Sequence, residues 1–167
     1  MTFNELKKAL AAEAQAAGIC AEWYNYILQA TSKERLLALY FGGFDFVAEH
    51  DYPSEPLRRE FDDVRKHFHI YENEAFAVKN ARKLVVYTGA KGKAEYTNFA
   101  VAQLWARKGA EMEVTASGNA YVTMDVAEGA RVSIKASGKS KVVVFHHGGT
   151  ITTQEAADEA VITIKKK

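Results

Sequence analysis

Apolar residues recur at helical spacing through the first eighty residues of the chain. Thr2 and Glu5 lie three residues apart at the start of an apolar stripe, which predicts a capping box that opens a first helix. A second capping box is predicted at Thr31 and Glu34, ahead of a longer stripe that runs to Val47. The first part of the chain is therefore predicted to be helical.

Two further helices complete this prediction. One is short and carries Trp23, Tyr26 and Ile27 on one face. The other begins near Pro56 and either continues to residue 69 or frays, so that residues 67–71 become extended. The pair Gly42-Gly43 interrupts the long stripe and indicates a kink or a close approach of another helix. Residues 70–80 are predicted to form an extended connector.

A ten-residue repeat replaces the helical period in residues 81–167. The second and fourth positions of each repeat are mostly apolar, and they alternate as in a strand with one buried face. The tenth position is always small, as in Ala110, Ala120 and Ser140. The ninth position often tolerates a positive φ, as in Gly109 and Asn119, which predicts a corner at every repeat.

Three architectures could use this period: an antiparallel meander, a three-sided solenoid and a two-sided solenoid. Only the two-sided solenoid, in which alternate repeats superpose, separates the outward residues by chemistry. One outer face then carries Val85, Val101, Trp105, Tyr121, Val143, Phe145 and Val161. The other carries Lys91, Lys93, Glu111, Glu113, Arg131, Lys135, Ile151 and Glu155. On this second face Lys91 with Glu111, and Lys93 with Glu113, are predicted to pair across neighbouring turns.

The predicted fold is therefore of the α+β class: a helical region with its connector over residues 1–80, packed on a β-solenoid of about four two-sided turns over residues 81–167. We expect the helices to cover part of the apolar face, because that face is too apolar to leave in water. Lys165, Lys166 and Lys167 end the last strand, where they would discourage end-to-end addition of another sheet.

Composition places the chain among ordinary folded proteins. It has 167 residues, 48% apolar and 26% charged, with a net charge of +1 that argues against commitment to nucleic acid. Its one cysteine, Cys20, permits no internal disulfide and suits a reducing compartment, and its neighbours favour a small buried side chain. No stretch is apolar enough to cross a membrane, and the amino-terminal residues open a helix rather than a secretory signal, so a cytoplasmic location is expected.

Histidines are the main candidates for chemistry. His67 and His69 flank a phenylalanine, and His146 and His147 are adjacent at a corner of the repeats. Zinc sites need three or four convergent ligands, whereas the sequence shows no acidic or cysteine partner beside the second pair. These four residues are therefore weak candidates for a metal or acid/base site, and ordinary polar histidines are the favoured interpretation.

Three segments of the chain resemble an uncharacterised family of small proteins encoded by gut bacteria and by their mobile elements or phages. The segments are Gly18-Ile19-Cys20-Ala21-Glu22-Trp23, Pro53 with Leu57-Arg58-Arg59-Glu60-Phe61, and Ser117-Gly118-Asn119-Ala120-Tyr121-Val122. The resemblance implies helices followed by short β repeats over most of the chain. The family has no established activity, so the resemblance assigns no functional residue.

We expect a non-enzymatic binding or interaction module without a cofactor, because no convergent set of polar groups is evident. Its contact surface is predicted at Trp105, Tyr121 and Phe145, for a protein partner or for self-association, and neither a membrane nor nucleic acid is expected as a partner. One alternative is a small metal-assisted or acid/base enzyme that uses the histidines. Another is a mobile-element or phage-encoded regulator that binds a host protein or nucleic acid. The sequence identifies no small-molecule ligand.

Overall fold

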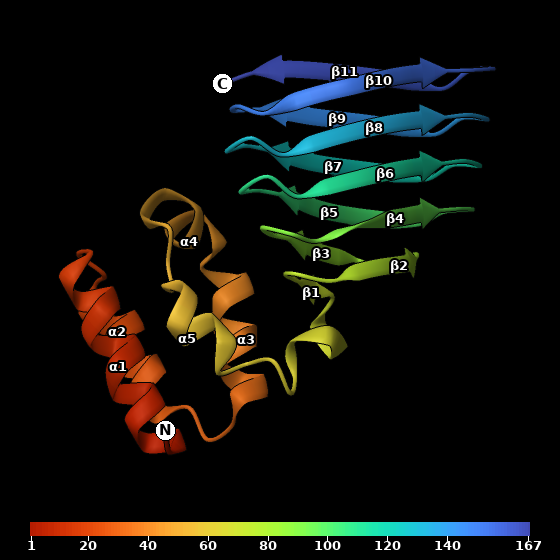
Figure 1. Ribbon diagram of the computed structural model, residues 1–167. Helices are drawn as coiled ribbons and strands as arrows, with labels where there is room; N and C mark the ends of the chain where they lie inside the picture. Colours follow the sequence, from red (N-terminus) through yellow and green to blue (C-terminus); the bar gives the residue numbers. More distant parts are fainter. The chain divides into compact units, whose positions relative to one another are not determined.

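Helices form the first part of the chain and parallel strands the remainder in the computed structural model, which describes residues 1–167 (Figure 1). The helices are α1 (Phe3–Ala16), α2 (Ala21–Gln29), α3 (Lys33–Gly42), α4 (Phe44–His50), α5 (Glu55–Arg59) and the 3-10 helix η1 (Arg65–Phe68). The strands are β1 (Ile70–Tyr71), β2 (Ala75–Lys79), β3 (Lys83–Val86), β4 (Lys91–Tyr96), β5 (Val101–Ala106), β6 (Glu111–Ala116), β7 (Tyr121–Val126), β8 (Arg131–Ala136), β9 (Lys141–His146), β10 (Thr150–Ala156) and β11 (Val161–Lys166). The predicted α+β class is confirmed.

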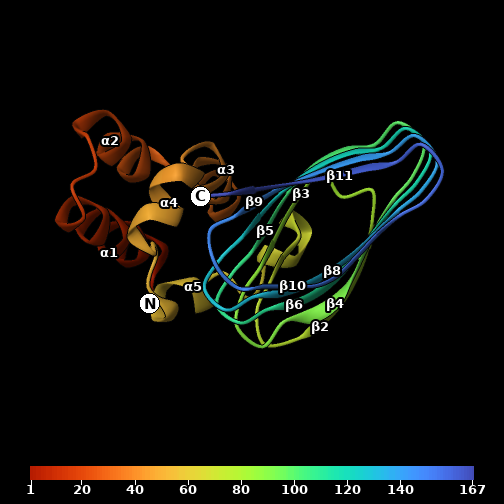
Figure 2. The ribbon, with the colours of Figure 1, turned by 90° about the horizontal axis from the view of Figure 1, so that it is seen from above.

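The strands form two parallel sheets, and successive turns superpose when the solenoid is viewed along its axis (Figure 2). The odd sheet has the order β1-β3-β5-β7-β9-β11, and the even sheet has the order β10-β8-β6-β4-β2. Alternate repeats therefore lie above one another, as the two-sided solenoid requires. The solenoid has about five turns rather than four. The additional turn comes from residues 70–80, which are not a free connector but hold β1 and β2, paired with β3 and β4.

Inward side chains from the two sheets form one continuous core. The second, fourth and sixth positions of the regular strands point between the sheets, because successive residues of a strand alternate sides. One column contains Leu84, Leu104, Met124 and Val144, all 0% exposed. The small tenth residues are buried at the corners, where Ser140 satisfies its hydroxyl by donating to the carbonyl oxygen of Ser137 at 2.8 Å.

The corners of the solenoid are of two kinds. In the corners after β5 and β7, two consecutive residues are left-handed, as in Lys108 (φ 52°) and Gly109 (φ 76°), whereas the corners after β3 and β9 have one, Gly89 and Gly149. Where an even strand passes to an odd one, a single left-handed residue precedes the ninth position, as in Gly118 (φ 64°). The predicted positive φ at Asn119 is therefore wrong, since Gly118 makes that corner.

Strand β10 departs from the repeat by one residue. Thr150 lies opposite Arg131 and Ile151 opposite Val132, and the register shifts at Thr152 before the regular pairing resumes. Ile151 therefore occupies an inward position, not the outward position predicted for it. The shift turns an isoleucine toward the core in place of a threonine, which the hydrophobic effect favours.

Tyr96 supplies a prediction about stability. Its side chain is 0% exposed, and its buried hydroxyl has no hydrogen-bond partner in the protein. Tyr96→Phe should raise the free energy of unfolding by about 1 kcal/mol, because it removes a polar group that gains no bond on burial. Urea unfolding of the two proteins measures the difference, and a less stable phenylalanine variant would contradict the prediction.

The same substitution has a pH signature. Burial raises the pKa of Tyr96 above its ordinary value of 10.0. The unfolded chain therefore releases this proton before the folded chain does, so the stability held below pH 10 falls as the pH rises beyond that value. Tyr96→Phe should show a smaller alkaline loss of stability than the unchanged protein.

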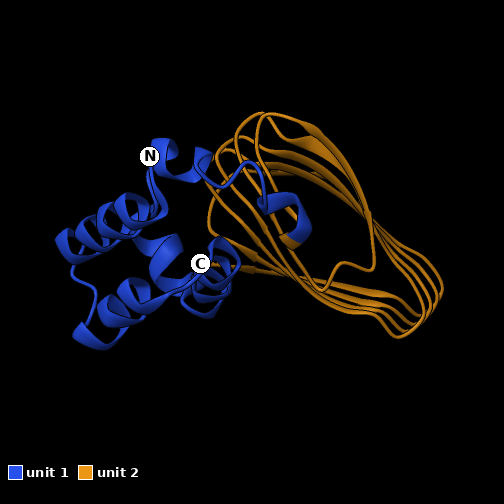
Figure 3. Cartoon of the chain, turned by 90° about the horizontal axis from the view of Figure 1, so that it is seen from below, with its two compact units in different colours: residues 1–67 blue, residues 68–167 orange.

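The chain divides into two compact units, residues 1–67 and 68–167 (Figure 3). The second unit contains the whole solenoid. The sequence predicts the boundary near residue 80, where the spacing of apolar residues changes. The second unit begins earlier because β1 and β2 already pair with β3 and β4.

Local signals position the helices of the first unit. The capping box at α1 is confirmed: Glu5 N donates to Thr2 Oγ1 at 3.1 Å, and Thr2 N donates to the Glu5 carboxylate at 2.7 Å. The second predicted box is wrong by one residue, since the hydroxyl of Ser32 caps α3 in place of Thr31. Gly43 ends α3 and precedes α4, which divides the long predicted helix in two.

A continuous helix over residues 56–69, one of the two forms predicted, is also wrong. Helix α5 is only five residues long, and turns separate it from the four-residue η1. Residues between the two helices form the tighter hydrogen bonds that span three residues, such as that from Val64 N to Phe61 O at 2.9 Å.

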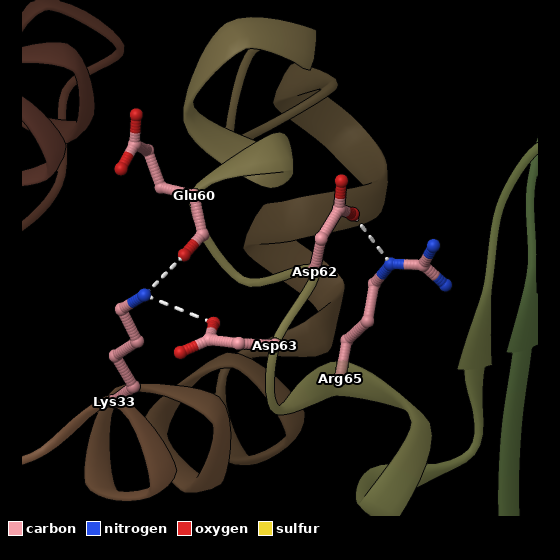
Figure 4. Close-up of polar contacts among 5 residues, drawn as sticks. All are labelled: Lys33, Glu60, Asp62, Asp63 and Arg65. Atoms are coloured by element: carbon pink, nitrogen blue, oxygen red, sulfur yellow. Dashed lines mark hydrogen bonds and ion pairs between the residues drawn. The ribbon is translucent and has the colours of Figure 1, made fainter.

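Ion pairs hold the turns between α5 and η1 (Figure 4). Lys33 Nζ of α3 donates to the Glu60 carbonyl oxygen at 2.5 Å and to Asp63 Oδ1 at 2.9 Å. Arg65 Nε donates to Asp62 Oδ1 at 2.8 Å. The hydrogen bond from Lys33 lowers the pKa of Asp63. The two adjacent aspartates are therefore structural partners of basic side chains.

Candidate functional site

Exposed apolar side chains gather at one end of the odd sheet. Val101 begins β5 and Tyr121 begins β7, and the two residues are paired in register on neighbouring strands. Val101 is 61% exposed and Tyr121 42% exposed, while Phe99, in the corner just before β5, is 80% exposed. We call these three residues the apolar strip. Their backbones belong to a regular parallel sheet and its corner, so the strip is presented on a rigid support.

The structure separates the three residues of the predicted contact surface. Trp105 and Phe145 share a column of the odd sheet, with Asp125 between them. Tyr121 lies four residues away along β7, about 13 Å from that column. Both Trp105 and Phe145 are partly buried, and the ammonium groups of Lys165 and Lys167 lie 5.8 and 5.4 Å from the Phe145 ring centre. Tyr121 instead lies beside Val101, with which it forms the apolar strip together with Phe99.

Phe99 is absent from the contact surface that the sequence predicts. The residue occupies the ninth position of its repeat, where glycine or asparagine is frequent and where the repeat indicates backbone conformation only. A large aromatic side chain at a corner is the signal that could have found it, because nothing in such a position can bury it between the sheets.

Two cations lie near the apolar strip. Lys141 is the register partner of Tyr121 on β9, and Lys139 belongs to the preceding corner. Both are exposed, and neither forms an ion pair within the protein. The strip therefore combines apolar contact area with positive charge that is available to a ligand.

The outer face of the even sheet is charged, as predicted. Lys91 Nζ lies 3.3 Å from Glu111 Oε2, and Lys93 Nζ lies 3.7 Å from Glu113 Oε2. These pairs line a shallow groove whose charges largely neutralise one another. Exposed ion pairs of this kind contribute only about 0–1 kcal/mol each.

The paired histidines at the corner after β9 have protein partners. His146 Nε2 is 2.9 Å from the Gly149 carbonyl oxygen and donates to it. His147 Nε2 is 2.8 Å from Asp125 Oδ1, although the sequence suggested that no acidic partner was near. Asp125 comes from the turn below, so the contact depends on register and not on sequence proximity.

The remaining candidate histidines do not join this pair. His67 lies in η1, and His69 precedes β1 with a φ of 56°. Within the solenoid, the odd sheet places β3, β5 and β7 between β1 and β9, which separates His69 from His146 by about 19 Å. No group of three His, Cys, Asp or Glu side chains is close enough to hold a metal ion.

Comparison with protein families, curated proteins and solved structures finds no match. No helix of the protein has the length and apolar character needed to span a membrane. Cys20, expected to be buried, is exposed at the start of α2.

Proposed function

We propose that this protein is a non-enzymatic interaction module that binds a protein partner through the apolar strip. The observation that carries the proposal is the exposure of Val101 and Tyr121, side by side on neighbouring strands, with the exposed Phe99 two residues before Val101 in the corner. Exposed apolar patches of this kind mark contact sites in soluble proteins, and tyrosine is enriched among the residues that dominate binding energy.

The chemistry around the strip specifies the kind of partner. Lys141 lies next to Tyr121 on the neighbouring strand, and Lys139 lies two residues before Lys141 in the corner; both lack internal ion pairs. A partner segment with an aromatic or aliphatic side chain flanked by aspartate or glutamate would fill the strip and pair with both lysines. We therefore propose an acidic segment with an apolar anchor as the ligand.

A random peptide library displayed on phage tests this proposal, because such a selection needs no candidate partner. Selection on the purified protein should enrich peptides with an apolar anchor beside acidic residues. Tyr121→Lys should weaken binding of a synthetic consensus peptide at least tenfold, because it removes ring contacts and adds charge within an apolar contact. Isothermal titration calorimetry measures the two affinities.

Thr115→Lys provides the matched control. It places the same side chain at an exposed position of β6, on the even sheet, and should change the affinity by less than about twofold. Equal weakening by Tyr121→Lys and Thr115→Lys would contradict the proposed site, as would a consensus without acidic residues.

A further inference from the structure

The carboxyl-terminal end of the solenoid is open. Strands β10 and β11 are the last in their sheets, so each has an edge without a partner strand (Figure 1). Ile162 and Ile164 are inward residues of β11 but remain partly exposed, whereas Val142 and Val144, one turn below, are 0% exposed. This last turn therefore leaves both backbone groups and apolar side chains uncovered.

The opposite end is closed by aromatic side chains. Phe76 of β2 is only 8% exposed, and its ring stacks on that of Tyr71 with centroids 5.1 Å apart. The first turn therefore offers little complementary apolar surface to the open last turn. A contact between two open ends uses the same surface on both copies, as the interface of a two-fold symmetric dimer does.

Charge is segregated across the open end. The acidic residues Glu155, Asp158 and Glu159 lie where β10 ends and in the corner that follows. The basic residues Lys165 to Lys167 lie where β11 ends. Because β10 and β11 run in opposite directions within the turn, the acidic and basic groups occupy opposite sides of the end.

We propose that a second copy of this chain docks on the open end, related by a two-fold axis, with β11 antiparallel to β11 of the second copy. An axis through Thr163 places Ile162 opposite Ile164 of the second copy, so that inward apolar residues meet. The same orientation brings Lys167, just beyond the end of β11, to the side of the contact where the corner with Glu159 of the second copy lies.

The charges select this orientation. A two-fold axis parallel to the strands would bring the lysines of both copies to the same side of the contact, whereas an axis perpendicular to them brings lysines to acidic residues. The terminal lysines thus repel a misoriented sheet, as an edge guard does, and also pair with a correctly oriented copy. Both sheets continue across the contact, which satisfies the unpaired edges.

A cysteine on the axis tests the register. In a Cys20→Ser background, Thr163→Cys should form a disulfide-linked dimer on mild oxidation, because directly opposite antiparallel residues have Cα atoms about 4.5–5.5 Å apart. Val161→Cys is the matched control. In the dimer the two cysteines at position 161 would be offset by four residues, about 13 Å along the strand, so this variant should not cross-link. Equal cross-linking of the two variants would overturn the register.

Charge exchange tests the pairing. Glu159→Lys and Lys167→Glu should each weaken the dimer about fivefold, because every substitution acts twice across the axis, and the double variant should restore the affinity. Sedimentation equilibrium measures the dissociation constants. A double variant no tighter than the single ones, or an unchanged protein that is monomeric at every concentration, would overturn the proposal.

Failure of this inference is separable from failure of the proposed function. Ile164→Lys should give a folded monomer, verified by circular dichroism, that still binds the selected peptide. Tyr121→Lys should lose the peptide and remain dimeric. Loss of the dimer in Tyr121→Lys but not in Ile164→Lys would show that self-association uses the apolar strip, which contradicts the open-end contact.

Discussion

Leu104→Ala should lower the free energy of unfolding of the solenoid by about 3 kcal/mol, whereas Val101→Ala should cost less than about 0.5 kcal/mol. Both residues belong to β5 and both are aliphatic. Leu104 is 0% exposed and lies between Leu84 and Met124 in the core, so its truncation leaves a cavity. Val101 is 61% exposed, and its truncation leaves none.

The two tryptophans allow this measurement to be confined to the solenoid. Trp23 belongs to the helical unit and Trp105 to β5. In a Trp23→Phe background, fluorescence during urea unfolding therefore reports on the strand that carries both substitutions. A Val101→Ala loss as large as that of Leu104→Ala would mean that Val101 packs within the fold. The apolar strip would then have a structural explanation instead of a binding one.

The two-sheet architecture could be predicted because the ten-residue period determines which residues point inward and which repeats superpose. An even number of residues per repeat keeps inward and outward positions in phase, and separation of the repeats by parity places the outward aromatic residues on one sheet. That face is mixed and not purely apolar, since Asp125 and Lys141 also lie on it. Lys91 and Glu111 illustrate the superposition of alternate repeats, since each lies at the first position of its repeat and their side chains pair across one turn.

The first turn could not be recognised by the same rule. Strand β2 keeps the alternation, with Phe76 and Val78 inward, but it breaks the spacing of the repeats. Phe76 lies opposite Gly92, sixteen residues later, whereas Gly92 lies opposite Met112, twenty residues later. The helix boundaries escaped for a different reason. Thr31 and Ser32 are both competent caps, and only the observed backbone shows that Ser32 is used.

The sequence predicts which sheet carries the candidate surface. It does not predict which residues of that sheet lie together, because odd and even repeats are distinguished without regard to position along the strand. Parity assigns Trp105, Tyr121 and Phe145 to one sheet, yet it ignores position along the strand. Tyr121 occupies the first position of its repeat and the other two occupy the fifth, so they lie in different columns. Val101 shares the first position with Tyr121, and a grouping by position would have joined them.

Gly149→Ala should destabilise the solenoid far more than Gly109→Ala, although both glycines occupy the ninth position of their repeats, in corners that lead from the odd sheet to the even one. Their φ values are nearly equal, at 75° and 76°. An added Cβ at Gly109 meets nothing within 4 Å, so only left-handed strain of about 1–2 kcal/mol opposes the substitution. At Gly149 the same atom would overlap the carbonyl oxygen of Ala130 and lie 3.0 Å from its backbone nitrogen, so backbone must move.

The cause of this difference is the early start of β10. Thr150 N donates to Ala130 O at 2.8 Å, whereas in the turn below it is Arg131 N, one position later in its repeat, that donates to Ala110 O. The corner between β9 and β10 is therefore one residue shorter, which brings Gly149 directly onto the turn beneath. We expect a total cost of about 3 kcal/mol or more for Gly149→Ala, measured by the same fluorescence-detected unfolding.

The pair of glycine variants also decides what the register shift achieves. The short corner turns Ile151 inward and Thr152 out of the core. Only glycine fits at position 149 of this short corner, so burial of Ile151 depends on Gly149. If Gly149→Ala forces the corner back to ordinary length, β10 should resume the regular register and Ile151 should become exposed, which hydrogen exchange of the β10 amides would detect. Equal costs for the two variants, with unchanged protection in β10, would contradict the close contact between Gly149 and Ala130.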